Sequence, residues 1–328
     1  MRRRPLLLLL PLLLTAVWAT NRRWVAPERP RPPTLLAHRG LAQDFDRAGL
    51  TGETCTAARM RPPRHGYLEN TIPSLKAAFA AGADRVEIDV HPTTDGHFVV
   101  FHDWTLDCRT DGHGVTRDHS LAELQALDVG YGYTADQGQT YPFRGAAVGG
   151  MPSLDQVLSA FPDHKLLINI KSGDPNEGAL LADALARLPP ERLARLAVSG
   201  HEAPVAVVAD RIGLAAITKP RLKACLLPYI ALGWTGFVPD ACHHTLLYVP
   251  INVAPWLWGW PYVFVDRMRA ADAEVYALAP WTGGWSDGLN TPEDLARLPP
   301  DYEGGILTDE IDLVAPRVAR PAVPPDAR

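Results

Sequence analysis

Two apolar stretches of the sequence each lead into a histidine. The run 34–37 precedes His38, and the run 98–101 precedes His102. Imidazole titrates near neutral pH, so two such side chains can supply a general base and a general acid on opposite sides of a reacting group. A single histidine after an apolar strand is more often a core or capping residue. Two of them favour an active site.

Carboxylates and an amide lie within two further apolar runs. Glu87 and Asp89 are two residues apart, so in a strand both side chains point to the same face. Asn169 lies within the similar run 166–171. Two carboxylates on one face repel each other unless they share a cation or a proton, and oxygen donors suit Mg²⁺ or Ca²⁺. We therefore predict that Glu87, Asp89 and Asn169 hold one divalent metal cation.

Two cationic side chains accompany these groups. Arg39 directly follows the first histidine, and Lys171 is two residues beyond Asn169. Guanidinium and ammonium groups hold phosphate oxygens, so we predict that both bind substrate. Together with the two histidines and the metal ligands, they indicate metal-assisted cleavage of a phosphate ester.

The elements that must position these residues alternate between strand and helix. Thr71 and Ser153 are expected N-caps of two helices, and Thr291 opens a third. Such alternation predicts parallel strands with crossover helices, and about 290 residues suit one TIM (β/α)₈ barrel with insertions at the barrel mouth. Enzymes of this class place their chemistry at the C-terminal ends of the strands. The predicted strands are 34–38, 86–90, 98–101, 166–171, 196–199, 275–279 and 305–308.

The N-terminus is typical of an exported protein. A basic start, residues 1–4, precedes the apolar stretch 6–17, which is shorter than the about 20 residues of a spanning helix. We expect the protein to be periplasmic, extracellular or anchored to a membrane and facing outward. The predicted organisation is a signal peptide or membrane anchor at 1–19, a Pro-rich linker at 20–33, the barrel domain at 34–318 and a tail at 319–328.

Composition excludes some classes of protein. With 47% hydrophobic and 21% charged residues, the chain can bury a core, and its net charge of −5 provides no basic surface for nucleic acid. Four cysteines in an exported chain allow one or two disulfides, and Cys225 with Cys242 is the first pair to expect. Four free buried thiols are the alternative.

One long segment is unusually apolar. Residues 241–265 contain no Asp, Glu, Lys or Arg but three tryptophans, Trp256, Trp258 and Trp260. Three prolines and a glycine argue against a continuous membrane helix. We consider two interpretations: a flap at the barrel mouth that receives an acyl chain or enters a membrane interface, and an ordinary buried strand and helix.

Taken in order, these motifs resemble those of the glycerophosphodiester phosphodiesterases. The resemblance runs from about residue 34 to 314 and is specific as a set. It rests on His38-Arg39-Gly40, Glu69-Asn70-Thr71, Glu87-x-Asp89, His102-Asp103, residues 106–112, Ile168-x-Ile170-Lys171, residues 276–282 with Trp281, and residues 305–309.

The resemblance implies a TIM barrel that needs a divalent cation and hydrolyses glycerophosphodiesters to glycerol 3-phosphate and an alcohol. A branch of the family acts on lysophospholipids as lysophospholipase D, producing lysophosphatidic acid. The resemblance also implies that His38 and His102 are the catalytic histidines. It assigns phosphate binding to Arg39 and Lys171, and metal binding to the carboxylates Glu87 and Asp89.

The sequence departs from the family pattern at several positions. Asn169 stands where many members have glutamate, which should weaken metal binding and leaves open a catalytically silent barrel that binds phosphodiester headgroups. An insertion at 41–67 precedes Glu69 and Asn70, which we expect to lead structurally into the following helix. Trp281 is predicted to shape the substrate pocket, with simple packing as the alternative.

Overall fold

The computed structural model describes residues 15–22, 24, 31–51, 54–283 and 287–318. The chain divides into two compact units, and each is described by itself. The larger unit contains residues 35–218 and 307–317, and the smaller unit contains residues 219–306 and the segments up to Thr34 and from Val318. Most of the predicted signal segment and linker, and the predicted tail, lie outside the described residues.

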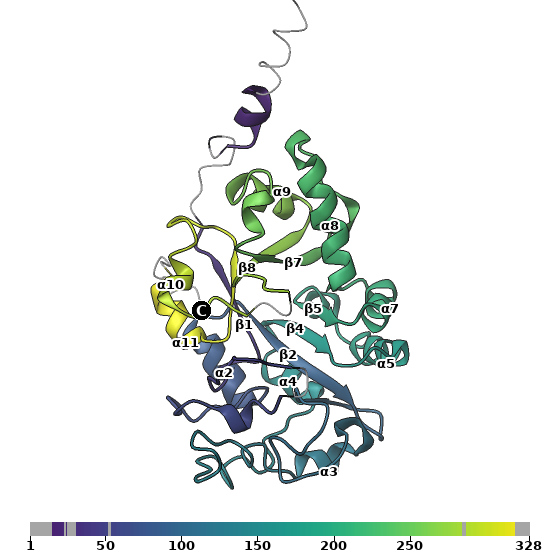
Figure 1. The fold of residues 1–328 in the computed structure, drawn as a ribbon. Helices are drawn as coiled ribbons and strands as arrows, with labels where there is room; N and C mark the ends of the chain where they lie inside the picture. The colour runs from purple at the N-terminus through teal and green to yellow at the C-terminus, as the bar shows by residue number, and fades with distance from the viewer. Residues whose placement is uncertain (1–14, 23, 25–30, 52–53, 284–286, 319–328) are drawn as a thin grey trace, which may run out of the picture. The chain divides into compact units, whose positions relative to one another are not determined.

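Parallel strands form the centre of the larger unit. β2 (Arg85–Pro92) is buried along its whole length and pairs with β1 (Thr34–Ala37) on one side and β4 (Lys165–Ile170) on the other. β5 (Leu196–Gly200) and β6 (Ala215–Ile217) continue the sheet in parallel. β4 and β5 are largely apolar, as expected of buried parallel strands, whereas in β2 the apolar residues Val86, Ile88 and Val90 alternate with the polar residues of the other face. Helices cover the sheet, and α5 and α7 lie side by side (Figure 1). The helices of this unit are α2 (Ile72–Ala81), α3 (Leu121–Gln125), α4 (Leu154–Ala160), α5 (Pro175–Leu185), α6 (Pro190–Leu193), α7 (Glu202–Ile212) and α11 (Ile311–Val314).

Local signals set the ends of the helices as predicted. The Thr71 hydroxyl caps α2 by accepting from the backbone N–H of Ser74, and Gly82 ends this helix in the left-handed conformation. The Ser153 hydroxyl caps α4 by accepting from the backbone N–H of Gln156, and the Gln156 side chain accepts in return from the backbone N–H of Ser153. The start of α2 follows Glu69 and Asn70 directly, so this cap also fixes where those two side chains leave the backbone.

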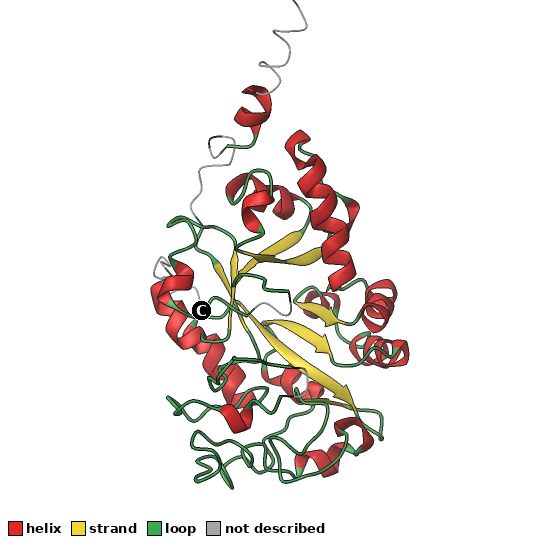
Figure 2. Ribbon diagram, viewed as in Figure 1, coloured by secondary structure: helices red, strands yellow, loops and turns green. Residues whose placement is uncertain are grey.

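The run 98–101 corrects one expectation. β3 (Phe98–Val100) pairs antiparallel with β2 and therefore is not a barrel strand. Much of the chain between β3 and α4 is loop (Figure 2). A short turn after β2 returns the chain along its neighbour, and the backbone N–H of Phe101 donates to the carbonyl of Asp89. His102 consequently reaches the carboxylates of β2 from a hairpin and not from the end of a parallel strand.

The smaller unit contains β7 (Thr245–Pro250) and β8 (Ala273–Leu278), which are parallel, and the first residues of β9 (Gly305–Thr308). Its main helices are α8 (Lys219–Leu232) and α9 (Tyr262–Ala270), and α10 (Pro292–Leu295) begins at the predicted Thr291 cap. The apolar segment 241–265 supplies β7 and the start of α9. The interpretation as an ordinary strand and helix is therefore right for residues 245–250 and 262–265.

Only part of that segment is exposed. Trp260 packs against Phe264 and Tyr302, with ring centroids 5.7 and 5.6 Å apart. Trp256 and Trp258, in the loop between β7 and α9, are 69% and 39% exposed. The prediction of a flap built on all three tryptophans is therefore wrong for Trp260.

Both cysteine pairs form disulfides. Cys225 bonds Cys242, as expected from the sequence, and Cys55 bonds Cys108. The alternative of four free thiols is wrong. The second bond ties the insertion 41–67 to the segment that follows His102.

Eight parallel strands alternate with helices along the chain, the pattern of a (β/α)₈ barrel. Their hydrogen-bonding order is β6-β5-β4-β2-β1-β9-β8-β7, with β3 added beside β2. Two of these strands, β6 and β7, were not among the predicted strands. Within the described part of the chain, none of the helices has the length and apolar character to cross a membrane.

Candidate active site

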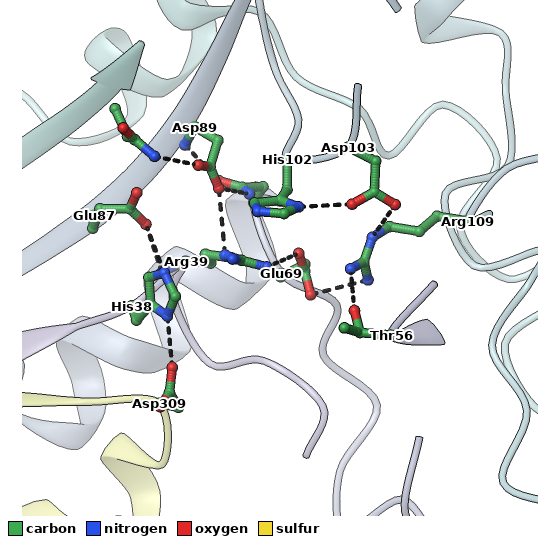
Figure 3. A network of polar contacts seen from close by, with 12 residues as sticks. His38, Arg39, Thr56, Glu69, Glu87, Asp89, His102, Asp103, Arg109 and Asp309 are labelled. Carbon is green, nitrogen blue, oxygen red and sulfur yellow. Dashed lines mark hydrogen bonds and ion pairs between the residues drawn. The ribbon is translucent and has the colours of Figure 1, made fainter. Parts of the chain in front are cut away.

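The first histidine lies at the end of β1. Its backbone N–H donates to the carbonyl of Thr308, and its Nδ1 is 2.6 Å from Oδ1 of Asp309. Its Nε2 is 3.9 Å from Oε2 of Glu87, so His38 stands between two carboxylates (Figure 3). Burial and the charge of Arg39 oppose protonation of this ring. The hydrogen bond to Asp309 and the charge of Glu87 outweigh both, and the pKa of His38 is raised.

The next residue, Arg39, contacts three carboxylates of the site, those of Glu87, Glu69 and Asp89. It has a φ of 61°, and Gly40 follows with a φ of 85°. This left-handed turn directs the Arg39 backbone N–H toward Glu87, at 3.2 Å from Oε2. Its guanidinium donates from Nη1 to Glu69 at 3.1 Å, and its Nε lies 3.5 Å from Oδ2 of Asp89. A side chain at position 40 would collide with the Oγ of Ser74, 2.4 Å from the site of a Cβ, so glycine is required there.

Glu87 and Asp89 share one face of β2, as predicted, but their surroundings differ. Asp89 is fully buried and accepts from the amides of Asn70, at 2.9 Å, and Asn169, at 2.8 Å. Lys171 Nζ lies 3.4 Å from its Oδ1. Burial opposes ionisation of Asp89, yet Lys171 and the other cations hold its pKa well below the usual range. Burial and the charge of Asp89 raise the pKa of Glu87.

The second histidine has one carboxylate partner. His102 Nδ1 is 2.7 Å from Oδ1 of Asp103, and the other oxygen of Asp103 accepts from Nε of Arg109 at 2.8 Å. Burial, with help from the charges of Arg39 and Lys171, lowers the pKa of His102 to about 4. Burial would raise the pKa of Asp103, but Arg109 and the hydrogen bond to His102 hold it well below its usual range.

Arg109 is a functional candidate that sequence reasoning missed. It is 2% exposed, and its guanidinium donates to Asp103, to Oε2 of Glu69 at 3.0 Å, and to the hydroxyls of Tyr133 and Thr56 at 2.6 and 2.5 Å. It therefore holds the carboxylate that orients His102 and the carboxylate that orients Arg39. The signal lay within the motif 106–112, where an arginine adjoins a cysteine, but nothing local shows what that arginine contacts.

The structure brings most of the predicted site together in the larger unit. Figure 3 shows His38, Arg39, Glu87, Asp89 and His102 in one polar network with Glu69, Asp103, Arg109 and Asp309. Asn70, Asn169 and Lys171 join this network at Asp89. Glu69 and Asn70 do more than lead into α2, because Asn70 bonds Asp89 through both its amide nitrogen and its amide oxygen. Trp281 belongs to the smaller unit, is 52% exposed and exchanges two 2.9 Å backbone hydrogen bonds with the side chain of Asn252. Its substrate contact stays a prediction.

The donor set fits a hard divalent cation in chemistry. Glu87 and Asp89 supply carboxylate oxygens from one strand face, and Asn169 lies opposite Asp89 in the register of β4. The raised pKa of Glu87 is the electrostatic sign of a repulsion that a cation would relieve. Among the described residues, no three or more His, Cys, Asp or Glu side chains are grouped to hold a metal, and the third ligand predicted here is an amide.

Comparison with known proteins agrees with the motifs. Residues 38–184 match the model of the glycerophosphoryl diester phosphodiesterase family. The chain is 31% identical over 256 residues to a glycerophosphodiester phosphodiesterase of Bacillus subtilis, covering 76% of this chain and 81% of that enzyme. The chain belongs to the glycerophosphoryl diester phosphodiesterase family. A glycerophosphodiester phosphodiesterase of Caldanaerobacter subterraneus is 41% identical over 107 residues, which span 32% of this chain and 40% of that protein.

Solved structures of the same family share the fold. The glycerophosphoryl diester phosphodiesterase domain of an uncharacterized Mycobacterium tuberculosis protein aligns with a TM-score of 0.62 at 19% identity, covering 87% of this chain and 99% of that domain. A phosphodiesterase of Oleispira antarctica, solved with the product sn-glycerol 3-phosphate, aligns with a TM-score of 0.50 at 21% identity, covering 86% and 94%. The predictions of a TIM-barrel fold and of a phosphoric diester hydrolase acting on glycerophosphodiesters are confirmed. Use of a divalent metal is general in this family.

Proposed function

We propose that this chain hydrolyses glycerophosphodiesters to glycerol 3-phosphate and an alcohol, with His38 and His102 as its acid and base. The single observation that carries the proposal is the pairing of each imidazole with a carboxylate at Nδ1, Asp309 for one and Asp103 for the other. Such a pairing directs the opposite ring nitrogen, Nε2, toward the substrate.

The reaction needs two proton transfers around one phosphorus atom. One imidazole accepts a proton from the attacking hydroxyl of water or of the substrate, and a P–O bond forms. The other imidazole donates a proton to the departing alcohol as the second P–O bond breaks. If a hydroxyl of the substrate attacks first, water opens the resulting cyclic phosphate in a second step with the histidine roles reversed. Both routes leave glycerol 3-phosphate and free alcohol.

Arg39 and Lys171 hold the charge that develops on the phosphoryl oxygens. Both cations already lie against Asp89, at 3.5 and 3.4 Å, which fixes their position before substrate arrives. Glu87, Asp89 and Asn169 would hold the divalent cation, Mg²⁺ or Ca²⁺. When bound, that cation supplies further positive charge to the phosphoryl group. With an amide in place of a third carboxylate, we expect binding weaker than at an all-carboxylate site.

The test is release of glycerol 3-phosphate from glycerophosphocholine and of lysophosphatidic acid from lysophosphatidylcholine, with and without EDTA. The variants His38→Ala and His102→Ala should each lower kcat about 10²–10⁴-fold. His164→Ala is the control, because the imidazole of His164 packs against the rings of Phe79 and Phe161, with centroids 4.2 and 5.7 Å apart, and so has a packing role. Activity that survives both histidine substitutions would overturn the mechanism. A folded protein that binds but cleaves neither substrate would favour the catalytically silent barrel.

We also propose that the chain is exported and works next to a membrane. The support is the basic and apolar N-terminal sequence together with the two disulfides, which persist in oxidising compartments. Cell fractionation with protease accessibility tests this location, and protection of the protein inside the cytoplasm would contradict it.

A further inference from the structure

The smaller unit exposes large apolar side chains around the end of α8. Leu227 and Leu232, on that helix, are 63% and 47% exposed, and Phe237 just beyond it is 46% exposed. Trp256 and Trp258, in the loop after β7, are also exposed. We call these five residues the apolar face. Single exposed apolar residues are ordinary, whereas a group of them marks an interaction site.

Hydrogen bonds fasten Trp258 and the segment after α8 to the last turns of that helix. The indole Nε1 of Trp258 donates to the carbonyl of Ile230 at 2.9 Å, and the hydroxyl of Tyr229 donates to the carbonyl of Trp258, also at 2.9 Å. The indole of Trp234 donates to the carbonyl of Ala231 at 3.1 Å. The loop after β7 and the segment after α8 are therefore both fastened to the last turns of that helix.

Charged side chains are nearly missing from this part of the sequence. Between residues 224 and 265, Asp240 is the single Asp, Glu, Lys or Arg. At the chain average of 21% charged residues, a stretch of 42 residues would carry about nine. A face that meets only water normally carries such charges, so the composition points to a partner that is itself apolar.

The N-terminal segment is attached to the same place. Asn21 donates from Nδ2 to the carbonyl of Trp234 at 3.2 Å, and its Oδ1 accepts from Arg267 at 3.0 Å. Arg267 also donates to the carbonyl of Gly233, at 2.8 Å, so it joins Asn21 to the end of α8. Residues 15–20 form a helical turn directly before Asn21. Residues 15–20, which include the end of the apolar stretch, thus lead into the smaller unit at Asn21, next to the end of α8.

Two exposed tryptophans lie on either side of Asn21 in the sequence. Trp18 and Trp24 are 50% and 62% exposed, and their ring centroids are 4.9 Å apart. The guanidinium carbon of Arg22 lies 4.7 Å from the Trp18 ring centroid. Exposed indoles next to an arginine are typical of side chains that sit at the headgroup level of a bilayer.

We propose that the apolar face binds the interface of the lipid bilayer to which the N-terminal segment leads. The indoles and leucines enter the boundary between headgroups and acyl chains, and these side chains carry no charge that would have to be desolvated. Attachment of Asn21 sets which surface of the smaller unit turns toward the lipid. The inference rests on the proposed export in one respect: export decides which membrane the protein meets in a cell.

The test places a fluorescent NBD label on single introduced cysteines of the full chain in vesicles of phosphatidylcholine and phosphatidylglycerol. Leu227→Cys and Phe237→Cys probe the apolar face. Leu180→Cys is the matched control, because Leu180 is an exposed leucine, at 49%, on α5 of the larger unit. We expect a nitroxide-labelled lipid to quench the label at 227 and 237 at least about twofold more strongly than at 180.

Each other outcome overturns the proposal. Equal quenching at 227, 237 and 180 would mean that the N-terminal segment tethers the chain without orienting it, and no quenching would mean that the face avoids lipid. Label self-quenching at 227 without vesicles, lost on dilution with unlabelled chain, would assign the face to a second copy. The same labelled variants should hydrolyse glycerophosphocholine at the unlabelled rate, so failure of lipid contact and failure of the proposed phosphodiesterase are separate results.

Discussion

Substitution of Arg109 should impair both the His102–Asp103 pair and the Arg39–Glu69 pair of the active site. Its buried guanidinium bonds Asp103, the partner of His102, and Glu69, the partner of Arg39. Arg109→Met keeps most of the volume but removes the arginine partner of Asp103 and one of the two arginine partners of Glu69, which keeps Arg39. Breaking a buried pair in this way costs about 3–5 kcal/mol of folding free energy.

The effect on catalysis follows from the positions of the Asp103 carboxylate and the His102 ring. Without Arg109 the Asp103 carboxylate is free to turn, and a displacement of about 1 Å at His102 lowers the rate roughly 10²-fold. The charge of Asp103 would also act more fully on the imidazole, so the pKa of His102 should rise and the acidic limb of the pH–rate profile should move to higher pH. Arg109→Lys keeps one charge but cannot bond both carboxylates, so it should recover only part of the loss.

The assay is a coupled measurement of glycerol 3-phosphate release from pH 4 to pH 9, run well below the melting temperature of each variant. Arg144→Met is the control, because Arg144 is an exposed arginine of the same unit that stacks on Tyr131 and Tyr141. A variant at position 109 that loses stability but keeps the wild-type kcat/KM and pH profile would refute the reasoning. Arg109 would then be a structural residue only.

Three further predictions concern the metal ligands, acid stability and the turn after β1. Asn169→Glu adds a third carboxylate, so calorimetric titration should show Mg²⁺ or Ca²⁺ binding about tenfold tighter or more, while Asn169→Gln should not; unchanged affinity in the glutamate variant would remove Asn169 from the metal site. Glu69 and Asp103 have pKa values lowered in the folded protein, so the stability they contribute is present above their usual values of 4.5 and 3.8 and is lost as pH falls below them. Urea unfolding between pH 6 and pH 3 should show that loss, and a smaller loss in Arg109→Met; equal pH dependence would contradict the assignment. Gly40→Ala should destabilise the protein by about 1–3 kcal/mol in thermal unfolding and displace Arg39, because the new Cβ meets Ser74. Gly49→Ala, which also has a positive φ but open space around it, is its control, and equal losses in both would mean that the contact at Ser74 is not decisive.

Several parts of the fold were predictable because their causes are local. Thr71, Ser153 and Thr291 cap helices through bonds that span three residues, and the pattern around each of them is visible in the sequence. Buried strands could be recognised in the sequence from their runs of apolar residues. The short turn at 94–96 predicts two strands joined in a hairpin, because a parallel neighbour would need a crossover of about a dozen residues, but the register of β3 on β2 came only from the structure.

For the active site, the sequence by itself determined which side chains are available and which of them share a face. Glu87 with Asp89 and Asn169 with Lys171 follow from the alternation of side chains along a strand, which is a property of the backbone. Tertiary structure alone decided the partners. Arg109 reaches Glu69 across 40 positions, and Asp309 reaches His38 across 271.

For the tryptophans, too, the sequence determines one part and the tertiary structure decides the other. Their number and the lack of charge around them belong to the sequence, but packing against Phe264 and Tyr302 leaves Trp260 only partly exposed, while Trp256 and Trp258 are exposed. Local patterns arise from the geometry of neighbouring residues, whereas ion pairs and exposure arise from burial among distant segments, where removal from water makes each unpaired charge costly. That cost is why two arginines and five carboxylates, scattered from residue 39 to residue 309, had to be brought into one network.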